Sequence, residues 1–292
     1  MSTTADTAAT VRRPTRPRRR RIKPGRLALY AGILVITAIM VLPFIWMLSA
    51  SLKLDREVFA FPIQWIPEAP RWQNFVDIWQ MIPLATFVYN TAKITVIVTL
   101  LQLFTSSFAA YAFAKLDFPY RNVLFLGYIA TIAVPWHVYM LPQFLMMREF
   151  GLNNTHMALI FLQAFTAFGV FLMRQFYMSI PDELCEAARI DGMSEYQIWW
   201  RIMLPLSKPA LSTLCIFTFV ATWNDFLGPM IYLTETELKT IQIGLRMFIS
   251  EYSTEYGLIM AASVVSLIPV LIVFLSLQRF FVEGIASTGL KG

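Results

Sequence analysis

Residues 181–209, PDELCEAARIDGMSEYQIWWRIMLPLSKP, form a polar segment between two long apolar runs. The segment is too long for a tight turn, and its ordered pattern predicts two short helices rather than a loose linker. Pro181 suits the first position of a helix, where its missing N–H is no loss, and Asp182 and Glu183 place negative charge at the positive end of the helix dipole. The first helix should therefore begin close to Pro181.

The end of this helix and the start of the next are also marked in the sequence. Gly192 is a natural helix stop. Ser194, with Gln197 three residues later, has the form of a capping box, which predicts a second helix start. The pair Leu204 and Pro205 should end that second helix, because the residue before a proline disfavours helical geometry. The two helices should meet at an angle.

One face of the first helix is built from small and apolar residues. Leu184, Ala187 and Ala188 share a face by helical spacing, with Glu186 at its border. Two adjacent alanines would let another surface approach the backbone closely. The alternative is an amphipathic helix that lies on its own protein.

The composition indicates a membrane protein. Hydrophobic residues make up 57% of the chain, charged residues only 14%, and the mean hydropathy is +0.59. A chain this apolar cannot bury its side chains in one soluble core. The net charge of +6 does not indicate nucleic acid, because nine of the 24 basic residues lie between Arg12 and Arg26. Residues 1–26 are predicted to be a disordered basic cytoplasmic tail.

Six uncharged or nearly uncharged runs predict an all-α, multi-pass protein with six transmembrane helices. Each run is long enough to cross about 30 Å of hydrocarbon at about 1.5 Å per residue. Pro135 and Pro142 predict a kink or an early end in the third run. The runs are 27–52, 94–114, 122–147, 150–173, 209–234 and 256–278.

The distribution of positive charge predicts the orientation. With six spans both termini share one side of the membrane, and the arginine-rich tail places that side in the cytoplasm. Of the 24 lysines and arginines, 17 then fall on the cytoplasmic side. The polar segment around residues 178–208 is cytoplasmic in this topology. Trp65, Trp72 and Trp79 fall in the first external segment, as membrane-interface anchors or as part of a surface for an external partner.

The sequence contains few groups that could support catalysis in this chain. Cys185 and Cys215 are not expected to form a disulfide, and His137 and His156 are too few and too far apart for a metal site. No GxxxxGK[ST] loop is present, and no nucleophile elbow lies near either histidine. We therefore expect no catalytic residues, no cofactor and no metal in this chain.

Asp225 is the one carboxylate well inside an apolar run. Burying it unpaired would be costly, so it should face a water-filled path, a partner residue or the protein interior. Trp223, Asn224 and Asp225 are interpreted as gating or structural residues at a subunit interface, or as direct solute contacts on the translocation path. A simpler alternative is a polar cluster that stabilises the helix near Gly228.

Several motifs together resemble a known family. Glu186, Ala187, Ala188 and Gly192, followed by Ile202, Leu204 and Pro205, resemble the cytoplasmic EAA loop of permease subunits of bacterial ABC importers. LDFPYRN, TWNDFLGP and QRFFVEGIASTGLKG, which begin at residues 116, 222 and 278, resemble carbohydrate permeases of the maltose type. The resemblance covers residues 27–292.

The resemblance implies the type I ABC importer permease fold and a set of partners. This chain would pair with a homologous second permease subunit, bind two ATPase subunits below the membrane, and receive a sugar, oligosaccharide or glycerol-phosphate-like solute from an extracytoplasmic binding protein. ATP and Mg²⁺ would be used by the ATPase partner. In the family the EAA loop docks on the ATPase as a coupling helix, which assigns ATPase coupling to its seven matching residues. The implied location is the bacterial cell membrane.

Two other functions fit parts of the sequence. A stand-alone secondary carrier could use Asp225 as its ion-coupling site, although few other charges lie in the spans. A membrane enzyme or sensor could use the cytoplasmic loop as a platform. Neither accounts for the full match to the permease pattern.

Overall fold

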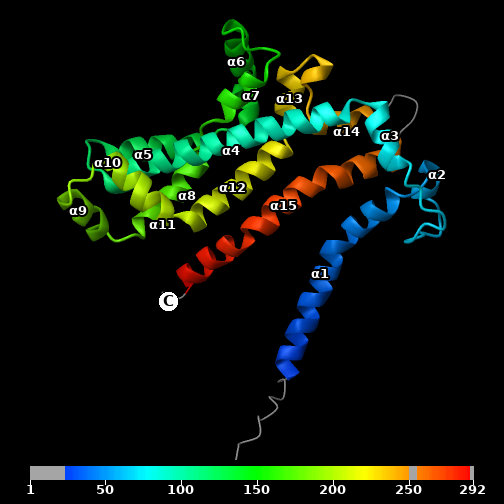
Figure 1. The fold of residues 1–292 in the computed structure, drawn as a ribbon, viewed down its shortest axis with the longest axis horizontal. Helices are drawn as coiled ribbons and strands as arrows, with labels where there is room; N and C mark the ends of the chain where they lie inside the picture. The colour runs from blue at the N-terminus through cyan, green and yellow to red at the C-terminus, as the bar shows by residue number, and fades with distance from the viewer. Residues whose placement is uncertain (1–23, 250–254, 290–292) are drawn as a thin grey trace, which may run out of the picture. The chain divides into compact units, whose positions relative to one another are not determined.

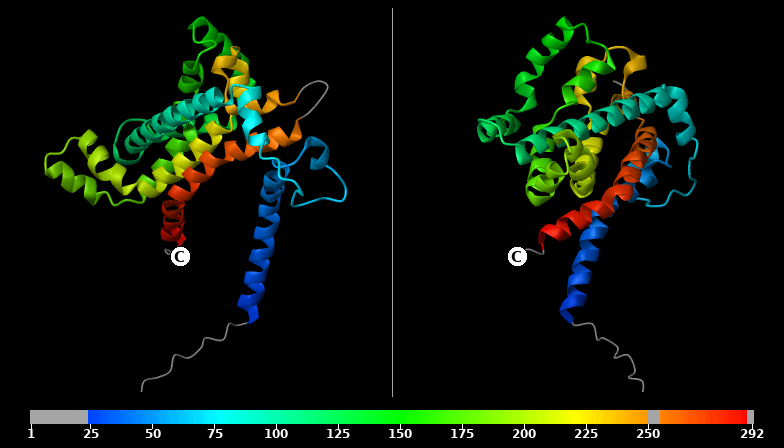
Figure 2. Two further views of the ribbon diagram at one scale, coloured as in Figure 1. Left: turned by 45° about the vertical axis from the view of Figure 1, so that its right-hand side comes forward. Right: turned by 60° about the vertical axis from the view of Figure 1, so that its left-hand side comes forward.

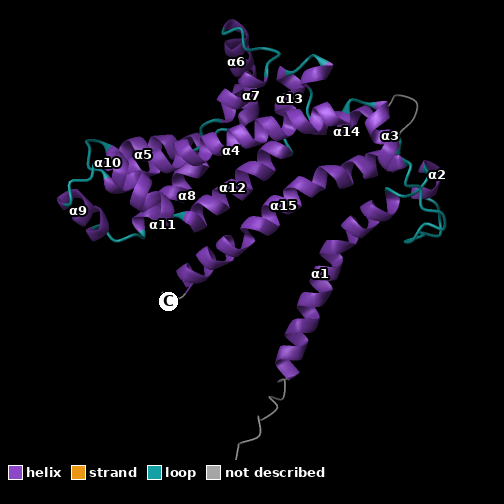
Figure 3. Cartoon of the chain, viewed as in Figure 1, coloured by secondary structure: helices purple, strands orange, loops and turns teal. Residues whose placement is uncertain are grey.

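The computed structural model describes residues 24–249 and 255–289, and every regular element within them is a helix (Figure 3). Most of the predicted tail, residues 1–23, lies outside the described residues. Contacts within the chain divide it into two units, residues 1–46 and residues 47–292.

The helix α1, Pro24–Ala50, contains the first unit's described residues and begins three residues before the predicted first span. Its stretch Ala28–Ala50 has a mean hydropathy of 2.5, and none of the window tested is buried by the rest of the chain. Residues 28–45 are therefore exposed on all sides of the helix, as expected of a helix that lipid or another chain surrounds, and only its end, at Ser49 and Ala50, is buried.

In the second unit, a long helix organises the packing of the others. This helix, α4, Leu84–Lys115, packs along α8, Ala167–Met178, and along α12, Lys208–Trp223, and α12 packs in turn on α15, Tyr256–Gly289 (Figures 1 and 2). The other α-helices of this unit outside the polar segment are short, and most of them pack near the two ends of α4 or along one side of it. These are α2 (Asp55–Val58), α3 (Asn74–Met81), α5 (Arg121–Ala130), α6 (Trp136–Glu149), α7 (His156–Gln163), α13 (Leu227–Tyr232) and α14 (Ile241–Met247).

Three apolar clusters follow one another along α4. The first joins its C-terminal half to α8, α12 and the polar segment, around Tyr177 and Trp199. The second joins its start to α3, α14 and α15, around Trp223, and the third joins its middle to α6, α7 and α13, around Tyr232. The polar segment is thus part of the same packed body as the apolar helices.

The described residues support up to six membrane spans. Four helices are long and apolar enough to cross a membrane alone, and two helix pairs do so if each bent pair counts as one span. One pair, Arg121–Ala133 and Trp136–Glu149, bends by 99°. This break falls at Pro135, so the predicted kink in the third run is confirmed.

Three predicted spans have clearly different limits in the structure. The second was predicted at 94–114, but its helix, α4, already begins at Leu84. The fourth was predicted at 150–173, but the apolar helix pair runs from His156 to Met178. The residues before His156 form a turn, in which Gly151 and Asn154 have φ angles of 68° and 56°. A helix cannot pass through two left-handed residues, so it begins after them.

The fifth predicted span, 209–234, is not one helix. The helix α12 ends at Trp223, and α13 begins only at Leu227. The backbone opens at Asp225, whose Oδ1 accepts a hydrogen bond of 3.1 Å from the N–H of Gly228. Pro229 follows and has no N–H for a continuous helical ladder.

The contact between α4 and α8 depends on a glycine. A Cβ atom on Gly169 would lie 2.3 Å from Ser106 Oγ and 2.7 Å from Thr166 Cγ2. We expect Gly169→Leu to lower the melting temperature of the solubilised protein by about 5 °C or more, because overpacking a tight contact costs about 1–3 kcal/mol. Thermal unfolding followed by size-exclusion chromatography measures this. Gly127→Leu is the matched control, since no atom lies within 4 Å of a Cβ there, and equal melting of both variants would contradict the packing argument.

Candidate functional site

We call residues 178–208 the elbow. Its first helix, α9, spans Glu183–Ile190, and the chain reverses at Gly192, where φ is +79°. Only glycine adopts this geometry without strain. Ser194 then caps α10, Glu195–Ile198, through the predicted capping box: the N–H of Gln197 donates to Ser194 Oγ, and the N–H of Ser194 donates to Gln197 Oε1 at 2.9 Å.

The predicted end of the second elbow helix is wrong. Helical structure continues from α10 through a π-helical turn, Trp199–Met203, and through α11, Leu204–Leu206, so it passes Pro205. A π turn is a local widening inside an α-helix, and here it ends at Met203, with one residue, Leu204, between it and Pro205. The helix ends at Ser207 and meets α12 at an angle of 80°.

The structure divides the predicted docking face. Ala188 is buried, and it packs with buried Cys185 inside the chain's own core. Ala187 and Glu186 are exposed. The predicted face is therefore only partly correct: Leu184 and Ala187 are exposed, but Ala188 lies on the buried side of α9 with Cys185 and faces the protein.

The other predicted coupling residues also separate into two groups. Ile202 and Leu204 pack against the inner cluster, whereas Gly192 and Pro205 are exposed. Four large apolar side chains of the elbow are also exposed. Their exposed fractions are 45% for Leu184, 86% for Ile190, 58% for Tyr196 and 53% for Trp200.

A buried lysine ties the elbow to α4. The Lys115 side chain is only 3% exposed, and its Nζ lies 2.5 Å from Asp182 Oδ1 and 2.6 Å from the carbonyl oxygen of Ile180. Lys115 is the last residue of α4, so the start of α9 is held directly on the end of that helix.

A second connection crosses the bend of the elbow. Arg189 Nε donates to Glu195 Oε1 at 2.7 Å, and Tyr111 of α4 donates its hydroxyl to Glu195 Oε2 at 2.5 Å. The hydrogen bond to Glu195 raises the pKa of Arg189 above its ordinary value. Arg189 Nη2 also reaches the carbonyl oxygen of Lys115, at 3.3 Å. Together these contacts fix both elbow helices on α4.

The burial of Cys185 can be tested chemically. Burial raises the pKa of the Cys185 thiol, so little reactive thiolate forms at pH 7. We expect N-ethylmaleimide to modify Cys185 in the folded, solubilised chain at least about tenfold more slowly than an Ala187→Cys variant that lacks both natural cysteines. Mass spectrometry measures the two rates. Similar rates would mean that α9 turns a different face outward.

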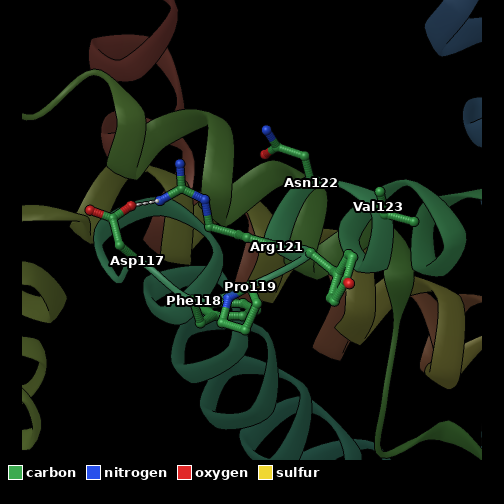
Figure 4. A pocket seen from close by; sticks show the side chains of 7 residues that line it. Asp117, Phe118, Pro119, Arg121, Asn122 and Val123 are labelled. Carbon is green, nitrogen blue, oxygen red and sulfur yellow. Dashed lines mark hydrogen bonds and ion pairs between the residues drawn. The ribbon is translucent and has the colours of Figure 1, made fainter.

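A shallow hollow of about 550 Å³ lies at the turn after α4, in the LDFPYRN stretch (Figure 4). Arg121 Nη1 is 2.8 Å from Asp117 Oδ1 and 2.9 Å from the carbonyl oxygen of Leu116. The only basic side chain in this hollow is therefore already paired, and its contacts stabilise the turn.

The three residues predicted for the translocation path lie in different environments. Trp223 is buried and donates from Nε1 to the carbonyl oxygen of Ser266 at 3.0 Å. Asn224 donates to the carbonyl oxygen of Val220 and accepts a bond from Gln242. Asp225 lines a cavity, whose wall includes neither Trp223 nor Asn224.

Sequence reasoning missed three polar residues near Asp225. Gln102, Gln143 and Gln163 come from α4, α6 and α7, and all three line the same cavity. Each lies in an uncharged run, and a glutamine at membrane depth is a signal of function that could have identified it. His156, in contrast, bonds the carbonyl oxygen of Leu238 at 2.8 Å.

The fold and the elbow together define a multi-pass membrane protein with a polar elbow fixed on α4. Comparison with known proteins identifies its family: residues 102–287 match the binding-protein-dependent transport system inner membrane component, and the chain belongs to this family. Its members are permease subunits of ABC importers.

Two relatives and one solved structure illustrate the similarity. The chain is 34% identical over 264 residues to an arabinooligosaccharides transport system permease protein of Halalkalibacterium halodurans, covering 89% of this chain and 95% of that one. It is 33% identical over 268 residues to an sn-glycerol-3-phosphate transport system permease protein of Yersinia enterocolitica, covering 89% and 94%. A crystal structure of a bacterial ABC transporter involved in the import of alginate matches with a TM-score of 0.78 at 25% identity, covering 92% of this chain and all of that one. The predicted importer permease fold is confirmed.

Proposed function

We propose that this chain is one permease subunit of an ATP-driven, binding-protein-dependent importer of a carbohydrate or related solute. Membership of the permease family supports the transport role. The solute class is supported by relatives whose names specify arabinooligosaccharides and glycerol phosphate. Arrival of the solute on an extracytoplasmic binding protein follows from the family description.

The elbow is the proposed docking site for a separate ATPase subunit. The observation that carries this proposal is the exposed face of α9, which combines Glu186, Ala187 and Ile190 on an elbow held to α4 by buried Lys115. Glu186 can accept a charge-assisted hydrogen bond from a basic partner residue. Movement of the docked ATPase would then be passed to α4 as a rigid displacement.

The remaining parts of the assembly follow from the same proposal. A homologous second permease subunit completes the path, two ATPase subunits use ATP and Mg²⁺, and this chain is non-catalytic. Both termini and the elbow face the cytoplasm, in agreement with the distribution of lysine and arginine. Exposed apolar residues along α15, such as Leu271 and Ile272, are available to lipid or to the second subunit.

Transport by the reconstituted assembly tests this function. Proteoliposomes with both permease subunits, the ATPase and the binding protein should take up solute only with ATP and Mg²⁺. Proteoliposomes with this chain alone should take up none under a proton gradient. If the chain alone took up solute, and the Asp225→Asn variant did not, the chain would instead be a secondary carrier.

A further inference from the structure

A cavity of about 310 Å³ opens between α4, α6, α7 and α13, beside the break that follows α12. Residues that the sequence analysis did not single out form most of its wall. Polar and aromatic lining residues are Gln102, Trp136, Tyr139, Gln143, Gln163, Phe165, Thr166, Asp225 and Tyr232.

A hydrogen-bond network fixes one side of the cavity. Gln163 Nε2 donates to Asp225 Oδ2 at 2.9 Å, and Gln163 Oε1 accepts from Thr222 Oγ1 at 3.1 Å. Gln102 Nε2 donates to the carbonyl oxygen of Gln163 at 2.6 Å, and Thr218 Oγ1 donates to Gln102 Oε1 at 2.7 Å. These side chains are held in place before any solute arrives, which lowers the entropic cost of binding.

Two other lining residues retain unused hydrogen-bonding capacity. Trp136 Nε1 donates to Gln143 Oε1 at 2.9 Å, which leaves the Gln143 amide nitrogen without a partner among the described residues. The Tyr232 side chain is 1% exposed, and its hydroxyl also lacks a partner in the described part of the chain. Buried polar groups are normally paired, so the unpaired Tyr232 hydroxyl indicates a ligand that pairs it, and the half-buried Gln143 offers that ligand a free donor.

The charge of the wall restricts the kind of ligand. The lining contains one carboxyl group and no lysine, arginine or histidine. Anionic solutes are usually held by arginine, lysine or helix N-termini, and an anion beside Asp225 would be unpaired or repelled. Aromatic faces and amides instead suit the apolar faces and hydroxyl groups of a sugar.

We propose that this cavity is a solute-binding subsite for a neutral, hydroxyl-rich molecule, and that it discriminates against phosphorylated and uronic-acid solutes. The inference rests on the proposed transport function and adds to it a site in this chain and a solute class. Gln143 and Tyr232 contact the solute, while Gln163 positions Asp225.

Uptake measurements test the solute class. The complete importer with its binding protein, in proteoliposomes, is given labelled arabinotriose and lactose as neutral probes and sn-glycerol 3-phosphate as the anionic probe. ATP-dependent uptake should be confined to the neutral probes. Gln143→Leu should lower it at least about tenfold, and Met146→Leu, on the same helix but outside the cavity, should leave it unchanged. ATP-dependent uptake of the phosphate would overturn this inference while preserving the proposed function; ATP-independent uptake would overturn the function itself.

Thiol labelling tests the cavity without depending on the solute. In a complete importer whose permease carries Cys185→Ser and Cys215→Ser, Gln143→Cys should react with a cationic methanethiosulfonate roughly tenfold faster than with an anionic one, after normalisation to a free thiol. Asp225→Asn should reduce that ratio to about one. The control Met146→Cys should show no preference for the cation. A preference for the anionic reagent at Gln143→Cys, or no reaction there, would contradict a water-accessible cavity that repels anions.

Discussion

Gly192→Val should abolish ATP-dependent uptake by the assembled importer while the protein still inserts in the membrane. Gly192 has a φ of +79°. An ordinary side chain in this left-handed geometry raises the free energy of the folded state by roughly 1–2 kcal/mol, and a β-branched side chain raises it further. The strain is relieved by changing the bend between α9 and α10. That change would displace the exposed docking residues of α9 relative to α4.

Uptake and co-purification of the ATPase measure the consequence of Gly192→Val. The matched control is Gly127→Val, because Gly127 lies in α5 with no atom within 4 Å of a Cβ. We expect Gly127→Val to transport at close to the wild-type rate. Wild-type uptake by Gly192→Val would show that the bend is not needed for coupling. Glu186→Lys should also reduce uptake, by reversing the charge of the exposed acidic group.

Lys115→Met should uncouple ATP hydrolysis from transport. The substitution keeps the length of the buried side chain but removes its contacts with Asp182 and with the carbonyl oxygen of Ile180. A hydrogen bond from a charged group contributes about 1.5–3 kcal/mol, and its loss from the half-buried carbonyl of Ile180 weakens the hold of α4 on the start of α9. We expect uptake to fall at least about tenfold, with ATP hydrolysis continuing in the assembled complex.

The ratio of solute moved to ATP hydrolysed measures this uncoupling. Lys208→Met is the control, because Lys208 is exposed at the start of α12 and forms no ion pair among the described residues. A normal ratio in Lys115→Met would mean that the elbow moves with α4 through apolar packing alone. A low ratio in both variants would indicate a general effect of lost positive charge.

Local features of the elbow could be predicted from the sequence because local chemistry determines them. A capping box requires only Ser194 and Gln197 at the right spacing, and the left-handed turn requires only Gly192. The continuation past Pro205 could not be predicted, since it depends on a π turn in a helix that packs against α4 and α8. Burial of Ala188 depends likewise on tertiary packing: helical periodicity defines a face but not the partner it meets.

The cavity could not be predicted for a different reason. Gln102, Gln143 and Gln163 are far apart in sequence, and each lies in an apolar run among other uncharged polar residues, so that none stands out. Only the fold brings α4, α6 and α7 together around Asp225. Asp225 itself stood out because a carboxylate within a long apolar run is rare.

Cross-linking between the elbow and the ATPase is the most direct test of the central claim that the elbow couples a separate ATPase to the membrane helices. In a chain without its natural cysteines, the cysteine introduced by Ala187→Cys is labelled with a short thiol-to-amine cross-linker. The comparison is Gln80→Cys in α3, at the predicted external side, labelled in the same way. The coupling account predicts a covalent product with the ATPase subunit from Ala187→Cys only, with a yield that changes when ATP is added. No product from Ala187→Cys, or a product from Gln80→Cys instead, would contradict it.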